Sequence, residues 1–335
     1  MFRRILVPLD GAARAEKAIP VAARLAKASG GSLVLLQVIS TPVDAGGFMY
    51  EPIVFTQADI DTEVSKATKY LMTLSLADDL AGIDVHTLIL IGTPAPSILS
   101  AIQTNEIDLV IMSSHGETGL MRWVMGSVAQ KIVRHSPVPV MVLRDGGPAL
   151  GEPSLIAPRV LVSLDGSHLA ESAILPAAQV VSALAGSTRG VLHLVRVVSY
   201  SPELEPLLAS SSMVGAHPVQ HEEEEAHKYM SDLTALLLRG DLARFNLDIT
   251  SSVIFSSDVA ATLVRLAEKG DELQGTTGCE LIAMATHGRS GLQRWAMGSV
   301  TERTLTATKL PMLIVRPAHV LEKHPHAQHE LSSVM

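Results

Sequence analysis

Short aliphatic runs alternate along the chain with segments in which apolar side chains recur every three to four residues. The aliphatic runs of the first half predict buried strands at residues 5–9, 33–39, 85–91, 109–114 and 138–144. The segments between them predict amphipathic helices at residues 14–29, 58–81, 94–103 and 127–135. Strands that are apolar on both faces and alternate with helices are typical of a parallel sheet covered on both sides. The pattern therefore predicts a doubly wound α/β fold.

Local signals mark two of the helix ends. The first predicted helix is followed by Gly30-Gly31, which is typical of a helix C-cap. The surrounding Ser29–Ser32 is similar to a phosphate loop, but it follows a helix rather than a strand, which favours helix termination. The helix predicted at 94–103 has Pro94 and Pro96 at its start, where a missing N–H is tolerated.

The same order of elements occurs a second time. Residues 5–11 read ILVPLDG, and residues 160–166 read VLVSLDG. Residues 115–128 and 287–300 match at ten positions without a gap, including the only two tryptophans. Such self-similarity indicates a duplicated domain. Aliphatic runs in the second half predict strands at residues 193–198, 247–255, 281–286 and 311–316.

The boundary between the two copies falls in a stretch rich in glycine and proline. Residues 148–157 form this predicted linker, so the predicted domains are residues 1–147 and 158–317. The remaining residues, 318–335, contain histidines without periodicity and predict a disordered tail.

Composition excludes several classes of protein. The 335 residues are 47% hydrophobic, which is enough for packed cores, but only 3% are aromatic. A formal net charge of −8 argues against nucleic-acid partners. The single cysteine, Cys279, excludes an internal disulfide and a multi-cysteine metal site. The N-terminal apolar run ends at Asp10, too early for a signal peptide, and no run reaches membrane-spanning length; the sequence predicts a cytoplasmic protein with no membrane segment.

The first candidate site is the turn after the first strand of each copy. Ligands of open α/β sheets bind beyond the carboxyl ends of the strands, and Asp10-Gly11 and Asp165-Gly166 lie at such ends. Helix capping by the aspartate is an equally good explanation of these two pairs.

The second candidate site is the loop after the fourth strand. It ends in Gly126-Ser127 and in Gly298-Ser299, each followed directly by a helix. Glycines let backbone N–H groups approach a ligand, and a helix N-terminus attracts anions, so the pattern indicates a phosphate site. The alternative is a long connection that ends in an N-cap, but its occurrence in both copies favours a ligand.

These motifs carry a resemblance to a known family. The chain resembles tandem universal stress proteins over residues 2–317, and the nucleotide signature of that family is Gly-x-x-Gly, nine residues, then Gly-Ser or Gly-Thr. The nine-residue spacing occurs here between Gly116 and Gly126 and again between Gly288 and Gly298. The first glycine of the signature is replaced by a serine and an alanine, at positions 113 and 285.

The resemblance implies a ligand and the residues that would bind it. The implied cofactor is ATP, with or without Mg²⁺, and ADP or AMP are the alternative ligands. Asp10 and Asp165 would reach the adenosine, Val38 and Val197 the base, and the glycines and serines of the signature the phosphates. The full implied set is Pro8, Asp10, Val38, Ser113, His115, Gly116, Gly126, Ser127 and Val128 in the first copy, and Asp165, Val197, Ala285, His287, Gly288, Gly298, Ser299 and Val300 in the second.

The resemblance also implies an architecture for each copy. It implies five parallel strands in the order 3-2-1-4-5, with the last strands, 138–144 and 311–316, pairing with each other, and allows homo-oligomers. The second copy has Ser167 after its Asp-Gly pair where the first has Ala12, so we expect the first copy to be the weaker site.

Three functions are compatible with this sequence. The leading hypothesis is an ATP-binding stress-response protein that senses or holds nucleotide without efficient turnover. A nucleotide-free interaction module is the second, and an adenylating or ATP-hydrolysing enzyme is the third. His115 and His287 could be general bases, but no orienting partner accompanies them, which favours loop packing or ligand contact. We therefore expect no catalytic residues and no protein ligands for a metal.

Overall fold

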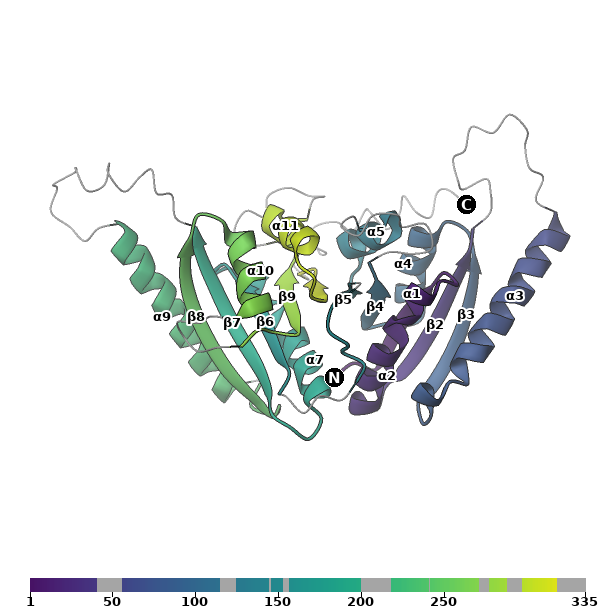
Figure 1. Cartoon of the computed structure of the whole chain (residues 1–335), viewed down its shortest axis with the longest axis horizontal. Coiled ribbons are helices and arrows are strands. Elements are labelled where there is room, and N and C mark those ends of the chain that lie inside the picture. The colour runs from purple at the N-terminus through teal and green to yellow at the C-terminus, as the bar shows by residue number, and fades with distance from the viewer. Residues whose placement is uncertain are drawn as a thin grey trace, which may run out of the picture. The chain divides into compact units, whose positions relative to one another are not determined.

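The computed structural model describes most of the chain in two parts. It describes residues 1–40, 56–114, 125–144, 146–152, 157–199, 218–240, 242–270, 277–287 and 297–317. The chain divides into two compact units, Met1–Pro153 and Ser154–Met335, which we call unit 1 and unit 2 and describe separately (Figure 1).

Unit 1 contains a five-stranded parallel sheet. Its strands are β1 (Arg4–Leu9), β2 (Ser32–Ile39), β3 (Asp84–Ile91), β4 (Leu109–Ser113) and β5 (Val140–Leu143). They lie in the order β3-β2-β1-β4-β5, which confirms the predicted order. The connecting helices are α1 (Ala13–Glu16), α2 (Ala18–Ser29), α3 (Gln57–Ser75), α4 (Pro94–Thr104) and α5 (Ser127–His135), with a 3-10 turn, η2, at Asp78–Leu80.

Unit 2 repeats this arrangement. Its strands are β6 (Arg159–Leu164), β7 (Gly190–Ser199), β8 (Leu247–Ser256), β9 (Leu281–Ala285) and β10 (Met312–Val315). Their order, β8-β7-β6-β9-β10, is again 3-2-1-4-5 when counted from the first strand of the unit. The helices are α6 (His168–Glu171), α7 (Ile174–Ala185), α9 (Pro218–Arg239), α10 (Val259–Lys269) and α11 (Ser299–Ala307). The pairing predicted between 138–144 and 311–316 stays a prediction.

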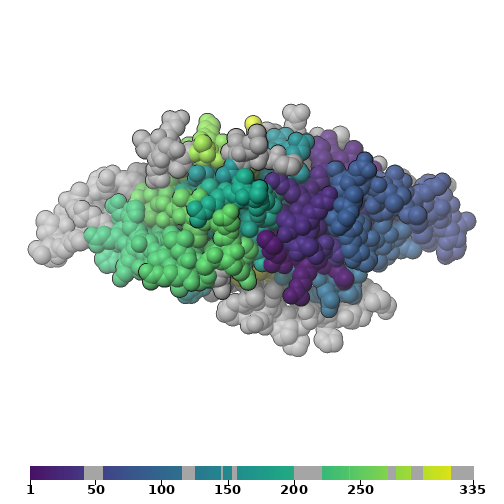
Figure 2. Space-filling model, turned by 90° about the horizontal axis from the view of Figure 1, so that it is seen from below, coloured from purple at the N-terminus to yellow at the C-terminus, as the bar shows by residue number. Residues whose placement is uncertain are grey.

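The strand order places helices on both faces of each sheet. Crossovers between parallel strands are right-handed, so the connections β1–β2–β3 lie on one face and the connections β3–β4–β5 on the other. Residues 1–40 pack against residues 56–114 within unit 1, and Figure 2 shows the purple surface of the first segment beside the blue surface of the second. The core between these layers is aliphatic and alanine-rich, as the low aromatic content requires.

Prolines set several element boundaries that the periodicity missed. The helix predicted at 14–29 is divided at Lys17 into α1 and α2, because Pro20 has no N–H to donate to the Glu16 carbonyl. The strand predicted at 138–144 begins only at Val140, since Pro139 cannot donate to the sheet. The predicted C-cap is confirmed, because Gly30 has a left-handed φ of 62°.

The long helix predicted at 58–81 is also shorter in the structure. α3 ends at Ser75, whose hydroxyl donates to the Met72 carbonyl at 2.9 Å and so competes with helix continuation. The 3-10 turn η2 follows it and leads into β3.

One helical stretch of the described residues is long and apolar enough to cross a membrane. It is His168–Ala185, with a mean hydropathy of 1.2, and 56% of it is buried in the structure. Its larger part, α7, contacts β6 and β7. This is the behaviour of a core helix, which passes the same test.

A pair of leucine truncations tests this core. Leu36 on β2 is fully buried, whereas Leu76 after α3 is 78% exposed. We expect Leu36→Ala to lower the free energy of unfolding of unit 1 by about 2–5 kcal/mol, because it leaves a cavity beside the sheet. The matched control, Leu76→Ala, should change it by no more than about 0.5 kcal/mol. Equal losses in the two variants, measured by denaturant unfolding, would contradict this packing.

Candidate functional site

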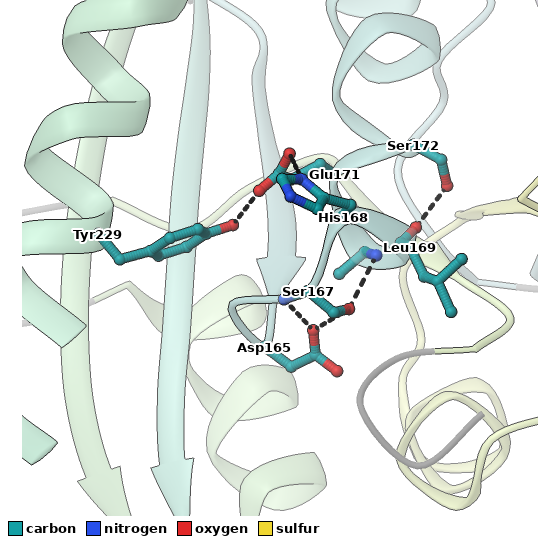
Figure 3. A network of polar contacts seen from close by, with 8 residues as sticks. Asp165, Ser167, His168, Leu169, Glu171, Ser172 and Tyr229 are labelled. Carbon is teal, nitrogen blue, oxygen red and sulfur yellow. Dashed lines mark hydrogen bonds and ion pairs between the residues drawn. The ribbon is translucent and has the colours of Figure 1, made fainter. Parts of the chain in front are cut away.

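The turn after the first strand has the same form in both units. Gly11 and Gly166 each have a φ of 84°, a conformation that glycine adopts readily. Asp10 Oδ1 accepts a hydrogen bond from the Ala12 N–H at 3.1 Å. Asp165 Oδ1 accepts from the Ser167 N–H at 2.9 Å and from its hydroxyl at 2.6 Å (Figure 3).

These contacts separate two roles that the sequence left open. In unit 2 the cap of α6 is Ser167, whose Oγ accepts from the Ala170 N–H at 3.3 Å, while Asp165 orders the turn before it. In unit 1 Ala12 occupies the N-cap position of α1 and provides no side-chain cap. The aspartate therefore shapes the turn in both units rather than capping the helix itself.

Beside this turn, unit 1 has an open cleft of about 490 Å³. It lies between the end of β2 and the middle of α3, which contributes Glu63, Lys66, Ala67 and Tyr70. Val38 contributes to its wall, so the structure places this predicted residue next to the turn of Asp10. Gly11 and Gln37 also line it.

A hydrogen bond between a tyrosine and a glutamate occurs at the equivalent place in each unit. Tyr70 Oη donates to Glu16 at 3.0 Å, and Tyr229 Oη donates to Glu171 at 2.9 Å (Figure 3). Burial, followed by the hydrogen bond to the glutamate, raises the pKa of both tyrosines. Each bond ties the long helix, α3 or α9, to the short helix after the turn.

Sequence reasoning missed this pair. The signal that could have found it is a second repeated motif, because residues 67–70 read ATKY and residues 226–229 read AHKY. Ala67 and Ala226 are both buried, and the tyrosine follows three positions later on the same helical face.

The residue before the predicted base-contacting valine differs between the units. Gln37 in β2 lies opposite Leu9, and Arg196 in β7 lies opposite Leu164, so the two positions are equivalent in register. Gln37 Oε1 is buried and accepts no hydrogen bond from the described residues. Arg196 is only 4% exposed, and its guanidinium carbon lies 5.3 Å from the centre of the Tyr229 ring.

The second candidate loop starts and ends at one place in each unit. The Gly126 N–H donates to the Ser114 carbonyl at 2.8 Å, and the Gly298 N–H donates to the Thr286 carbonyl at 2.7 Å. These bonds hold the start of the helix against the end of the strand, next to Ser113 in unit 1 and Ala285 in unit 2. Close approach favours glycine here, since a Cβ on Gly298 would lie 3.1 Å from the Thr286 carbonyl oxygen.

Both helices that follow this loop begin without a side-chain cap. Gly126 is the N-cap residue of α5 and Gly298 that of α11, and no side chain of the described residues caps either end. By contrast, α3, α6 and α10 are capped by Thr56, Ser167 and Asp258. The first-turn N–H groups of an α-helix lack intrahelical acceptors, and the predicted residues Ser127, Val128, Ser299 and Val300 lie at these two helix starts, with both serines exposed.

Not every predicted residue can be placed. His115, Gly116 and Gly288 lie outside the described residues. Pro8 is half-buried in β1, and Val197 is buried in β7. His287 Nδ1 lies 2.9 Å from the hydroxyl oxygen of the preceding residue, Thr286. Over the described ranges, no group of three or more His, Cys, Asp or Glu is arranged to hold a metal ion.

The single cysteine lies away from these loops. Cys279 precedes β9 and is buried, and this burial raises the pKa of its thiol to about 12. The thiol is therefore protonated at neutral pH, which makes it a poor nucleophile.

The buried tyrosine–glutamate pairs predict an unusual alkaline titration. Two of the four tyrosines, Tyr70 and Tyr229, should ionise at higher pH than free tyrosine, because their neutral form is favoured in the folded protein. Their contribution to stability should be complete below pH about 10 and be lost as the pH rises further.

Phenolate ultraviolet absorbance measures this titration. The late fraction is the part of the absorbance change that occurs at higher pH than the ionisation of free tyrosine. It should shrink in Tyr70→Phe and Tyr229→Phe and vanish in the double variant. A late fraction of unchanged size in the folded double variant would contradict the assignment.

Comparison with known proteins fits this geometry. The sequence model of the universal stress protein family matches residues 1–144 and 157–316. A universal stress protein of Mycobacterium tuberculosis is 29% identical over 247 residues, which cover 72% of this chain and 74% of that protein. One of Mycolicibacterium smegmatis is 25% identical over 323 residues, covering 93% and 97%.

A solved structure shares the fold at greater sequence distance. The crystal structure of a universal stress protein from Archaeoglobus fulgidus aligns with a TM-score of 0.63 at 19% identity, covering 93% of this chain and 98% of that one. Two matches to one family model, over a repeated motif and a repeated strand order, account for nearly the whole chain. The chain therefore belongs to the universal stress protein family and contains two domains of that family in tandem.

Proposed function

We propose that the chain binds an adenine nucleotide, with ATP as the leading candidate, and holds it without efficient turnover as a stress-response sensor. The observation that carries this proposal is a juxtaposition at one sheet edge. The Asp10 turn, the cleft beside Val38 and the uncapped start of α5 all follow the carboxyl ends of adjacent strands in unit 1. This edge is where open α/β sheets bind their ligands.

The cleft suits the nucleoside part of such a ligand. Its volume of about 490 Å³ is within the usual range for a small-molecule site. Val38 and Ala67 offer apolar contact to a base, and the buried Gln37 Oε1 needs a donor that the described residues do not supply. The exposed Asp10, on the neighbouring turn, could accept from ribose hydroxyls.

The phosphates would lie at the helix start. The first-turn N–H groups of α5 and the Ser127 hydroxyl can donate to phosphate oxygens, and the helix dipole favours their negative charge. This mode of binding needs no basic side chain, so a net charge of −8 does not oppose it. Mg²⁺ would be bound mainly by the phosphates themselves.

The proposal of slow turnover rests on the carboxylates at this edge. Asp10 and Asp165 accept hydrogen bonds from their own turns, and Glu16 and Glu171 accept from tyrosines. Carboxylates held in this way are poorly placed to act as a general base toward a water molecule.

Analysis of bound nucleotide tests the proposal directly. Freshly purified protein is denatured by heat, and the released small molecules are identified by mass spectrometry, with calorimetric titration of MgATP in parallel. ATP or ADP at up to two per chain is the expected result. No released nucleotide and no calorimetric binding would leave the interaction module, and rapid release of pyrophosphate, AMP or phosphate would indicate an enzyme.

A charge substitution at the helix starts separates binding from folding. In Ser127→Asp combined with Ser299→Asp, a carboxylate at the first helical position should repel phosphate and weaken ATP binding at least about tenfold. The same carboxylate favours the helix N-terminus, so the thermal unfolding midpoint should stay the same or rise.

The matched control is Ser127→Asn with Ser299→Asn, which changes the side chains to a similar size without the charge. It should retain most of the affinity. Equal ATP affinity in the aspartate and asparagine variants would place the phosphates elsewhere.

A further inference from the structure

The residues around the unit 1 cleft have counterparts in unit 2, but the two units differ at one position, which we call the floor residue. In both, a tyrosine on the long helix bonds a glutamate on the short helix, and a buried alanine lies one turn before the tyrosine. In both, a valine near the strand end follows the floor residue. That residue is Gln37 in unit 1 and Arg196 in unit 2, at equivalent positions of the strand register.

In unit 2 the side chain of Arg196 packs against the tyrosine ring. Tyr70 is a wall of the open cleft in unit 1, beside Gln37. In unit 2 the guanidinium lies over the equivalent ring of Tyr229, at 5.3 Å, and the arginine is 4% exposed. A buried arginine remains charged, and stacking on an aromatic ring is a favourable contact for it. Displacing this side chain to admit a base would cost that contact.

The rim of the region differs in charge as well. On α3, Glu63 and Lys66 form an ion pair of 2.6 Å, so the rim of the unit 1 cleft is close to neutral. The corresponding positions on α9, counted from the two tyrosines, are Glu222 and Glu225, both exposed; neither position has a lysine, and Glu225 lies 3.6 Å from His221 Nδ1. Two acidic side chains at this rim disfavour a polyphosphate.

We infer that position 37/196 determines which unit accepts the nucleobase. Gln37 forms the floor of a base subsite in unit 1. Its Oε1 is buried and has no donor among the described residues, and it would accept from the exocyclic amino group of a base such as adenine once the side-chain amide turns toward the cleft. Arg196 fills the equivalent subsite in unit 2. The tandem chain then binds one nucleotide, in unit 1, although Ser167 made unit 2 the stronger candidate on sequence. This inference rests on the proposed nucleotide binding.

Calorimetric titration of the full chain with MgATP tests the assignment through stoichiometry. The wild type should bind one ATP per chain. Gln37→Arg should lower the affinity at least about tenfold, because the new guanidinium closes the unit 1 subsite. Arg196→Gln should raise the stoichiometry to two, and the double exchange should restore one site, now in unit 2.

A matched control removes the same charge elsewhere in unit 2. Arg189 is exposed and pairs with Asp248 at 3.1 Å, at the opposite end of β7 from Arg196. Arg189→Gln should keep the wild-type stoichiometry and affinity. Circular dichroism melting of each variant identifies any that is unfolded; if Arg196→Gln is, the loss in folded Gln37→Arg carries the test.

The results separate failure of this inference from failure of the proposed function. A wild type that binds two ATP, or a folded Gln37→Arg variant with unchanged affinity, would overturn the role of position 37/196 while leaving nucleotide binding intact. Absence of ATP binding in both the wild type and Arg196→Gln would overturn the proposed function, and this inference with it.

Discussion

Parallel pairing of a doubly buried central strand governs the rest of each unit. β1 lies between β2 and β4, and β6 lies between β7 and β9, so the central strand of each unit is hydrogen-bonded to a neighbour on both sides. Because the pairing is parallel, all strands end at the same edge, and each connection must begin there. The strand order reverses beside the central strand, which leaves the turn of Asp10 or Asp165 next to the end of β4 or β9, where the N-cap residue of the following helix is held.

Both units keep this frame but differ in the groups at the candidate site. The turn geometry, the tyrosine–glutamate bond and the uncapped helix starts occur in both units. The floor residue and the rim charges do not, since Gln37 faces an open cleft and Arg196 packs on Tyr229. Such differences lie at the carboxyl edge of the sheet rather than in the core, where packing restricts substitution.

The sequence predicted the strands and the duplication well, because both depend on local apolar runs that recur along the chain. The strand order came from the resemblance and is confirmed. Helix boundaries were less accurate: the division at Lys17 depends on one missing N–H at Pro20, which hydrophobic periodicity does not register. The contact of Arg196 with Tyr229 joins residues on different elements, so it became visible only once the strand register and the path of α9 were known.

The central claim is that the carboxyl edge of the sheet in unit 1 is a nucleotide site. Backbone amide chemical shifts of the isotopically labelled full chain, followed during titration with MgATP, test it residue by residue. We expect the largest shifts at Gly11 and Ala12, at Val38, and at Ser127–Ala129, which belong to the turn, the cleft and the uncapped helix start. Saturable shifts confined to residues away from that edge, with these amides unmoved, would contradict it.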